Sequence, residues 1–427
     1  MQDNLGSDIL PISMNLLSSA QIKGLWDRNI RLDFHSDVNL LIGVNGSGKT
    51  TIVSLLAAVL RADVSALNRT HFQSIALDLA SSKGRNTARL EIEKITDEQS
   101  PFTRYVFKIK KAGVRKKQVY ILHEERVYSP RYRLSEVRRQ SEGLAEELAL
   151  LVNITWLSVH RSQQSISREE QYESLVDKKL NQVSNNLVRY FSLLSTRGTN
   201  QTEHFQKAVF QSLLHHPTES NAFAIVKGLD LAAEERALTQ IFREFGVCDE
   251  STIEAIDKQF KLVRQFVERG GVRAFTWDQL VATVGMLRNH SIVQEWHRLI
   301  EQLQAIYAPR DQFLRMLSSL MPKKTFIINN KNELAATIGA RTLPLRSLSS
   351  GEKQLLIILG EALLQDKAPC IYIADEPELS LHVTWQEQLI ANLRRVNPNA
   401  QILFATHSPD IVGQYSKNIM DMERILG

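Results

Sequence analysis

A glycine-rich loop between an apolar strand and an apolar helix constrains the fold of this 427-residue chain more than any other feature. The segment Gly43–Thr50 reads GVNGSGKT, and it joins the apolar runs 38–42 and 50–62. Glycines let backbone N–H groups wrap a phosphate, the lysine supplies a charge to the β- and γ-phosphates, and the Thr hydroxyl completes a Mg²⁺ shell. The segment therefore predicts a phosphate loop in an α/β fold.

We expect this loop and the first helical turn to bind ATP with Mg²⁺, and Thr50 to be a magnesium ligand. The predicted nucleotide contacts are Asn45, Gly46, Ser47, Gly48, Lys49, Thr50 and Thr51.

A second glycine-containing turn lies far downstream, where Leu348–Gln354 reads LSSGEKQ and opens an apolar helix over 351–364. A helix start with free N–H groups is another anion site, yet one γ-phosphate needs only one phosphate loop. The simplest use of this second site is to close over the nucleotide held by another copy of the chain. The sequence therefore predicts a homodimer or a higher homo-oligomer.

Two adjacent carboxylates, Asp375 and Glu376, end the apolar run 370–374. Asp375 could hold Mg²⁺ through water, and Glu376 could polarise the attacking water. They could also be ordinary loop residues, but the phosphate loop upstream favours the catalytic interpretation. His407 follows the apolar run 402–406, and its imidazole could bond the γ-phosphate or the water, although a lone histidine in this place is more often structural.

The remaining pattern defines three expected parts. Alternating strands and helices after residue 322 predict a parallel sheet, with ligands at the carboxyl ends of its strands. Periodicity predicts a strand over 22–34 and then an antiparallel sheet over 72–79, 88–95, 104–111 and 118–123. The chain from 130 to 321 is helical apart from a strand over 153–159, with helix breaks expected at Gly198, Gly246, Gly270-Gly271 and Pro309. We divide the chain into an N-terminal ATPase lobe (1–164), a helical insertion (165–321) and a C-terminal ATPase lobe (322–427).

Composition limits the compartment and the partners. Two cysteines exclude a disulfide framework and fit a reducing cytosol, and no apolar run reaches the roughly 20 residues of a membrane span. We expect a cytoplasmic protein without membrane contacts. Basic residues far outnumber acidic ones between Arg104 and Arg139, which indicates either a solvated hairpin surface or a footprint on a nucleic-acid backbone.

The motif order resembles the ABC-type ATPase heads of the SMC, Rad50 and RecF group. It is most similar to the branch that holds the OLD ATPases and the AAA-family ATPase subunits of bacterial anti-phage systems such as Septu, PARIS and retron-linked modules. The resemblance rests on the phosphate loop, LSSGEKQ, the Asp-Glu strand end, Glu378–His382 (ELSLH) and Ala405–Pro409 (ATHSP). It implies an ABC-type P-loop ATPase head with an antiparallel β annex and a helical insertion.

The resemblance also implies roles for individual residues. Ser349 and Gly351 would contact the γ-phosphate bound to the opposite protomer, and Glu378–His382 would couple the two sites. A glutamine that senses Mg²⁺ would be Gln163 or Gln164. Ser350 and Glu352 replace the usual glycine and glutamine, which disfavours a transporter subunit. The insertion lacks long heptad repeats and a Cys-x-x-Cys hook, which disfavours a Rad50-like role.

The segment 408–427 leaves no room for the Toprim nuclease domain of OLD-type nucleases, so we expect an ATPase that controls a separately encoded effector, namely a nuclease. The alternative is a RecF-like repair ATPase that clamps DNA, for which the basic segment is the main argument. A third interpretation is a scaffold that binds ATP and hardly hydrolyses it.

Overall fold

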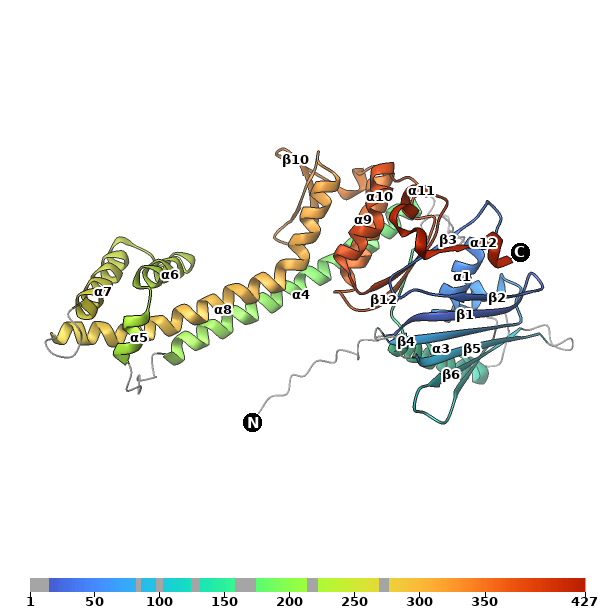
Figure 1. Cartoon of the computed structure of the whole chain (residues 1–427), viewed down its shortest axis with the longest axis horizontal. Helices are drawn as coiled ribbons and strands as arrows, with labels where there is room; N and C mark the ends of the chain where they lie inside the picture. Colours follow the sequence, from blue (N-terminus) through green and yellow to red (C-terminus); the bar gives the residue numbers. More distant parts are fainter. Residues whose placement is uncertain are drawn as a thin grey trace. The chain divides into compact units, whose positions relative to one another are not determined.

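The computed structural model describes residues 15–81, 86–96, 103–123, 131–157, 174–212, 222–268 and 276–426 (Figure 1). It divides into two compact units. The first unit comprises Met1–Arg189 and Arg310–Gly427, and the second comprises Tyr190–Pro309. Among the described residues, no helix is long and apolar enough to cross a lipid bilayer.

The first unit contains a five-stranded parallel sheet in the order β14-β3-β13-β12-β8. Its central strands β12 and β13 are apolar and buried along almost their whole length, as expected of parallel strands covered on both faces. The predicted parallel sheet and its two buried strands are therefore confirmed, as is the α/β class. The strands are β3 (Val38–Ile42), β8 (Ile154–Leu157), β12 (Cys370–Asp375), β13 (Ala400–Ala405) and β14 (Ile419–Asp421).

A six-stranded antiparallel sheet, in the order β2-β1-β4-β5-β6-β7, forms the predicted annex. The single strand expected over 22–34 is wrong, because the chain reverses at Trp26 and Asp27 and pairs Leu25 with Arg28. Trp26 and Asp27 have φ of 52° and 58°, as a two-residue hairpin turn requires, but Trp-Asp is not a usual turn signal. The strands are β1 (Asn15–Leu25), β2 (Arg28–Asp33), β4 (Ser74–Ser81), β5 (Asn86–Ile95), β6 (Arg104–Lys111) and β7 (Gln118–His123).

Helix α1 (Lys49–Leu60) lies in the main core of the first unit. Its Ile52 and Leu56 are fully buried in one cluster with Ile373 of the parallel sheet and with Ile22 and Phe107 of the antiparallel sheet. Burial of one such side chain contributes about 1.5–3 kcal/mol. The helix that follows the phosphate loop is thus held by both sheets, which fixes where the loop lies.

The rest of the first unit surrounds these sheets. Strands β9, β10 and β11 form a small antiparallel sheet in the order β11-β10-β9. The predicted helices over 351–364 and 383–396 are confirmed as α9 and α10. These elements are α2 (Val64–Asn68), α3 (Arg131–Leu151), β9 (Thr325–Ile328), β10 (Leu334–Ile338), β11 (Arg341–Leu343), η2 (Leu345–Ser347), α9 (Ser350–Leu364), α10 (Val383–Val396), α11 (Pro409–Val412), η3 (Gly413–Asn418) and α12 (Met422–Leu426).

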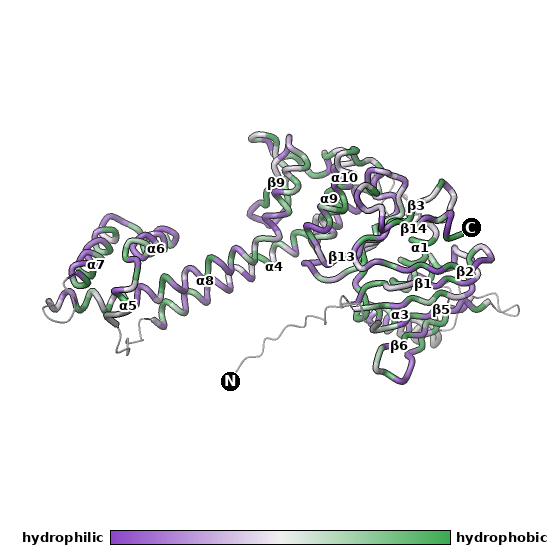
Figure 2. Tube along the Cα trace, in the orientation of Figure 1, coloured by the Kyte–Doolittle hydropathy of each residue, from purple (hydrophilic) through white to green (hydrophobic). Residues whose placement is uncertain are grey.

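The second unit is helical, and its helices share a buried cluster that includes Phe205, Phe260 and Trp296. In Figure 2, α6 and α7 change between purple and green along their length, as expected of helices with one apolar face. The unit contains α5 (Ala222–Gly228), α6 (Leu231–Glu244), α7 (Glu250–Glu268) and parts of α4 (Leu175–Ser212) and α8 (Trp277–Leu320).

Two of the predicted helix breaks are wrong, since Gly198 lies inside the 38-residue α4 and Pro309 inside the 44-residue α8. A Cβ on Gly198 would collide with the Tyr307 side chain, so glycine here permits close packing of two helices instead of ending one. The break at Gly246 is confirmed, because this residue follows the end of α6 with φ of 70°. Gly270-Gly271 lie outside the described residues.

Candidate functional site

The phosphate loop has the backbone geometry that its glycines predict. It runs from the end of β3 to Lys49, the first residue of α1. Gly46 and Gly48 have φ of 83° and 86°, in the left-handed region that residues with a Cβ rarely adopt. The first N–H groups of α1 have no partner within the helix and are available to a phosphate. Strand, loop and helix therefore occur in the predicted order.

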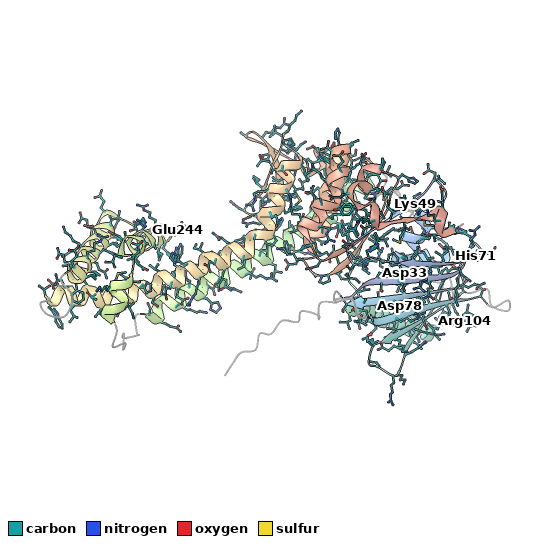
Figure 3. All side chains as sticks on the ribbon, in the orientation of Figure 1. Asp33, Lys49, His71, Asp78, Arg104 and Glu244 are labelled. Carbon is teal, nitrogen blue, oxygen red and sulfur yellow. The ribbon has the colours of Figure 1, made fainter. Side chains whose placement is uncertain are left out.

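Lys49 lies inside this loop with only 4% of its surface exposed (Figure 3). Its Nζ donates hydrogen bonds of 2.9 and 3.1 Å to two carbonyl oxygens at the start of the loop. Burial lowers the pKa of Lys49, and the negative charges of Glu376, Asp375 and Glu378 partly offset this effect. Three carboxylates from the C-terminal part of the chain thus lie close enough to act on the loop lysine.

Thr50 and Asp375 meet at the base of the loop. The Thr50 hydroxyl donates a 2.9 Å hydrogen bond to Oδ1 of Asp375. A hydroxyl and a carboxylate oxygen at this separation fit Mg²⁺, which prefers oxygen ligands and retains several waters. These two residues would hold the ion, which when bound would supply positive charge against the phosphates.

Glu376 and His407 are brought together at the ends of neighbouring strands β12 and β13. His407 Nε2 lies 4.0 Å from Oε1 of Glu376, and both side chains are partly exposed. Glu376 has φ of 49°, while its N–H donates a 2.8 Å hydrogen bond to the Ala405 carbonyl. A glutamate in the left-handed region is strained by roughly 1–3 kcal/mol, and such strain concentrates at functional sites.

A cavity of about 500 Å³ opens beside this pair. It brings Asn45 of the phosphate loop together with Glu376, Glu378 and His407, whereas Asp375 does not line it. A cavity lined by a candidate base and a candidate phosphate or water partner can accept a hydrolytic reaction. The lining residues are Asn45, Glu376, Glu378, Leu379, Gln386, His407, Ser408, Pro409 and Asp410.

The LSSGEKQ turn contacts the loop that follows β12. Ser349 caps α9 in a capping box with Glu352, and a Cβ on Gly351 would collide with the Ser380 carbonyl. The buried side chain of Gln354 donates a 2.8 Å hydrogen bond to the carbonyl of Pro377. Within the described part of the chain, neither Ser349 nor Gly351 lines the cavity. Helix α9 therefore contacts the backbone of the loop after Glu376 through the close approach of Gly351 and the side chain of Gln354.

The other predicted site residues divide into two groups. Ser47 accepts a weak 3.4 Å hydrogen bond from Lys49, and Thr51 lies half-buried in the first turn of α1. Gln163 and Gln164 lie outside the described residues, so the magnesium-sensing glutamine stays a prediction.

Trp26 is a residue that sequence reasoning missed. A Cβ on Gly48 would collide with its indole ring, so the ring covers the end of the phosphate loop. Trp26 remains 45% exposed and therefore presents aromatic surface beside the loop. The hairpin turn between β1 and β2 places Trp26 beside Gly48. The sequence pattern indicates one continuous strand here and therefore does not predict this turn. An aromatic residue shortly before a phosphate loop was the only available signal.

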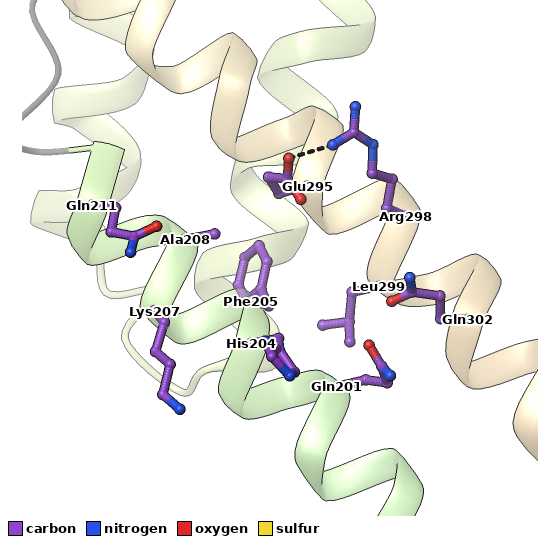
Figure 4. Close-up of a pocket in the computed structure, with 10 residues that line it drawn as sticks. All are labelled: Gln201, His204, Phe205, Lys207, Ala208, Gln211, Glu295, Arg298, Leu299 and Gln302. Atoms are coloured by element: carbon purple, nitrogen blue, oxygen red, sulfur yellow. Dashed lines mark hydrogen bonds and ion pairs between the residues drawn. The ribbon is translucent and has the colours of Figure 1, made fainter. Parts of the chain in front are cut away.

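The second unit has a groove of its own between α4 and α8, with a volume of about 470 Å³ (Figure 4). Arg298 and Glu295 form an ion pair of 2.5 Å along one wall. No residue of the phosphate loop or of the carboxylate motif lines this groove. Its walls are formed by Gln201, His204, Phe205, Lys207, Ala208, Gln211, Glu295, Arg298, Leu299 and Gln302.

Comparison with solved structures finds similar chains at low identity. The Smc head domain of Pyrococcus furiosus, bound to the C-terminal domain of ScpA, is 13% identical over 96% of this chain and 93% of that chain, with a TM-score of 0.38. The SMC head domain from Thermotoga maritima is 12% identical over 93% and 91%, with a TM-score of 0.35. The recombination mediator protein RecF is 10% identical over 94% and 95%, with a TM-score of 0.31.

Residues 27–412 match the family model of the AAA ATPase domain. This range includes the phosphate loop, the Asp375-Glu376 strand end and His407. The chain belongs to the AAA ATPase domain family, and it is an ATPase.

Proposed function

We propose that this ATPase is a regulatory or sensor subunit of a bacterial anti-phage defence system. In this proposal it acts in the cytoplasm, dimerises head-to-tail when it binds ATP and Mg²⁺, and controls a separately encoded effector, namely a nuclease. The helical insertion (165–321) transmits the change to that partner. The resemblance to OLD-like ATPase subunits supplies the biological setting, and the contacts of α9 supply the physical argument.

The observation that carries this proposal is the contact of the α9 start with the loop after the catalytic carboxylates. Gly351 packs on the Ser380 backbone and Gln354 donates to Pro377, so a shift of the loop after Glu376 moves the helix start. Ser349 is exposed at this start. A helix N-terminus attracts phosphate, so an exposed one can bind the γ-phosphate held by another protomer.

Helix α9 also has direct contacts with α4 inside the first unit. Lys353 Nζ donates a 2.7 Å hydrogen bond to Oδ1 of Asp177, and Lys179 pairs with Glu361 at 2.5 Å. A Cβ on Gly360 would be 2.8 Å from the Val183 side chain. Through these contacts α9 packs directly against the start of α4. Closure of the dimer would therefore bias the helices that carry the proposed partner surface.

A native-cell purification tests the effector claim. The tagged Glu376→Gln protein, in which we expect ATP to persist, is compared with Lys49→Ala, which we expect to lack ATP. We expect one nuclease to co-purify in a stoichiometric complex, and we expect the amount of nuclease recovered to differ between the two variants. Recovery of both variants without a stoichiometric partner would overturn this part of the proposal.

DNA clamping of the RecF type is the second candidate, and it rests on the basic antiparallel annex. Several of those charges are already paired: Lys108 with Glu93, Lys117 with Glu91, and Lys111 with Glu147. Near the β6–β7 turn, Lys110, Arg115 and Lys116 are exposed. Neutralising Lys110 and Lys116 tests this candidate. Duplex binding that weakens with salt and with these changes would favour it.

A further inference from the structure

The carboxylate of Glu378 joins the loop after β12 to the loop after β13. Its Oε1 accepts a 2.7 Å hydrogen bond from the Thr406 hydroxyl and a 2.8 Å hydrogen bond from the N–H of His407. Hydrogen bonds to a charged acceptor are roughly twice as strong as neutral ones. The backbone of His407 is therefore held directly by Glu378.

Gln386 forms a second link between the same loops. Its Oε1 accepts a 2.7 Å hydrogen bond from the Ser408 hydroxyl, and its Nε2 donates a 2.9 Å hydrogen bond to the Leu381 carbonyl. This amide therefore holds Ser408, the residue after the histidine. The two links share Thr406, whose hydroxyl oxygen also accepts a 3.0 Å hydrogen bond from the N–H of Ser408, and the Glu378 carboxylate holds the backbone of His407 directly.

The second oxygen of Glu378 has an unusual environment. Oε2 is buried and has no hydrogen-bond partner among the described residues. A buried acceptor without a partner costs about 1–3 kcal/mol. Glu378 also lines the cavity shared by Glu376 and His407. Buried polar atoms without a partner are rare in native structures, and a catalytic role is one reason for them.

We infer that Glu378 is a positioning residue for ATP hydrolysis, because it holds His407 in place beside Glu376. Glu378 contacts no reacting atom in this scheme and acts through the histidine. The inference rests on the proposed catalytic roles of Glu376 and His407. Misplacement of a catalytic group by about 1 Å can reduce the rate roughly 100-fold, so loss of the Oε1 acceptor is expected to act mainly on kcat.

A double-mutant cycle on the full chain tests the inference. We measure steady-state ATP hydrolysis for the wild type, Glu378→Ala, His407→Ala and the double variant. Each single variant is expected to lose about tenfold or more in kcat, with KM for ATP changed by less than about twofold. The double variant is expected to match His407→Ala, because in this proposal Glu378 acts on catalysis only through the His407 side chain. Multiplied losses, or wild-type turnover of His407→Ala, would overturn the inference.

Two conservative variants separate positioning from charge and from folding. Glu378→Gln keeps an oxygen that can accept both bonds, so we expect kcat within about threefold of the wild type. If kcat of Glu378→Gln is as low as that of Glu378→Ala, the charge itself is needed. This result would overturn the inference that Glu378 acts by positioning His407. Glu378→Asp keeps the charge but withdraws the acceptor by one methylene. If Glu378→Ala does not fold, this variant replaces it in the cycle, with the same expected dependence on His407.

The matched control is Glu387→Ala, which removes an exposed glutamate next to Gln386 on α10. We expect kcat, KM and the melting temperature of this variant to equal those of the wild type. These assays require no effector. If the wild-type protein controls no effector but the double-mutant cycle gives the expected result, only the proposed function is overturned. A multiplicative cycle in a protein whose Glu376→Gln variant still traps the dimer would overturn only the role of Glu378.

Discussion

The hydroxyl of Thr50 donates a 2.9 Å hydrogen bond to the carboxylate of Asp375, 325 residues further along the chain. This bond joins the start of α1 to the end of β12. Both elements are fixed by burial, α1 between two sheets and β12 between β13 and β8 of the parallel sheet. The two proposed magnesium ligands are therefore held by the core of the first unit.

Removal of the loop lysine should abolish nucleotide binding. In Lys49→Ala the phosphates lose the ammonium group that lies inside the loop, so we expect ATP affinity to fall about 100-fold or more. Calorimetric titration with ATP and Mg²⁺ measures this loss. Lys331→Ala, which removes an exposed lysine of the β9–β10 turn, is the control, and near-normal affinity of Lys49→Ala would contradict the proposed site.

The proposed role of Glu376 as the catalytic base can be tested separately from ATP binding. Glu376→Gln keeps the size of the side chain but cannot accept a proton, so we expect turnover to fall about 10²–10⁴-fold with ATP affinity retained. The same variant should accumulate as a dimer with ATP in sedimentation experiments. A Glu376→Gln protein with normal turnover would remove the residue from the role of base.

Catalysis across two protomers predicts complementation. Ser349→Arg should block hydrolysis and spare ATP binding, although loss of the helix cap is expected to reduce stability by about 0.5–2 kcal/mol. Mixed with Lys49→Ala, it should restore one working site per heterodimer, because the intact loop then faces an intact Ser349. Activity that never recovers in any mixture would speak against the head-to-tail dimer.

The indole of Trp26 should contribute to nucleotide affinity. Trp26→Ala exposes the end of the phosphate loop and removes the aromatic surface beside it, so we expect about a fivefold or larger loss of ATP affinity. Trp26→Phe should retain most of the affinity. Equal affinities for the wild type and the alanine variant would show that the ring only shields the loop.

Alkaline pH should weaken ATP binding earlier than an ordinary lysine would. Burial lowers the pKa of Lys49, so the free protein loses this charge at a lower pH than an exposed lysine. The affinity for ATP should therefore fall as pH rises through the lowered pKa. In the same window unfolded chains bind more protons than folded ones, so this group makes stability rise with pH. Binding titrations across alkaline pH, with Lys49→Ala as the reference, measure the effect.

The phosphate loop and both buried strands could be predicted because their signals are local. GVNGSGKT stands between two apolar runs, and the Asp375-Glu376 pair ends another. The hairpin at Trp26 could not be predicted, since Trp-Asp adopts left-handed backbone only in the context of the paired strands. The helix break expected at Gly198 was wrong for a related reason. The glycine serves a close approach to Tyr307, and a contact between distant residues leaves no local pattern.

The role of Glu378 was hidden in the same way. Its partners Thr406 and His407 belong to another strand end, and only the parallel pairing of β12 with β13 brings them within hydrogen-bond distance. Sequence spacing identified His407 as a candidate but could not show what holds it.

The packing of Gly351 on the Ser380 carbonyl decides which residue of the LSSGEKQ turn is useful for genetics. Any side chain at position 351 would push apart two segments of one protomer, whether or not a second protomer ever binds. An inactive Gly351 variant would thus mimic a failed dimer. Ser349 has an exposed side chain, and its substitution is the cleaner probe of association.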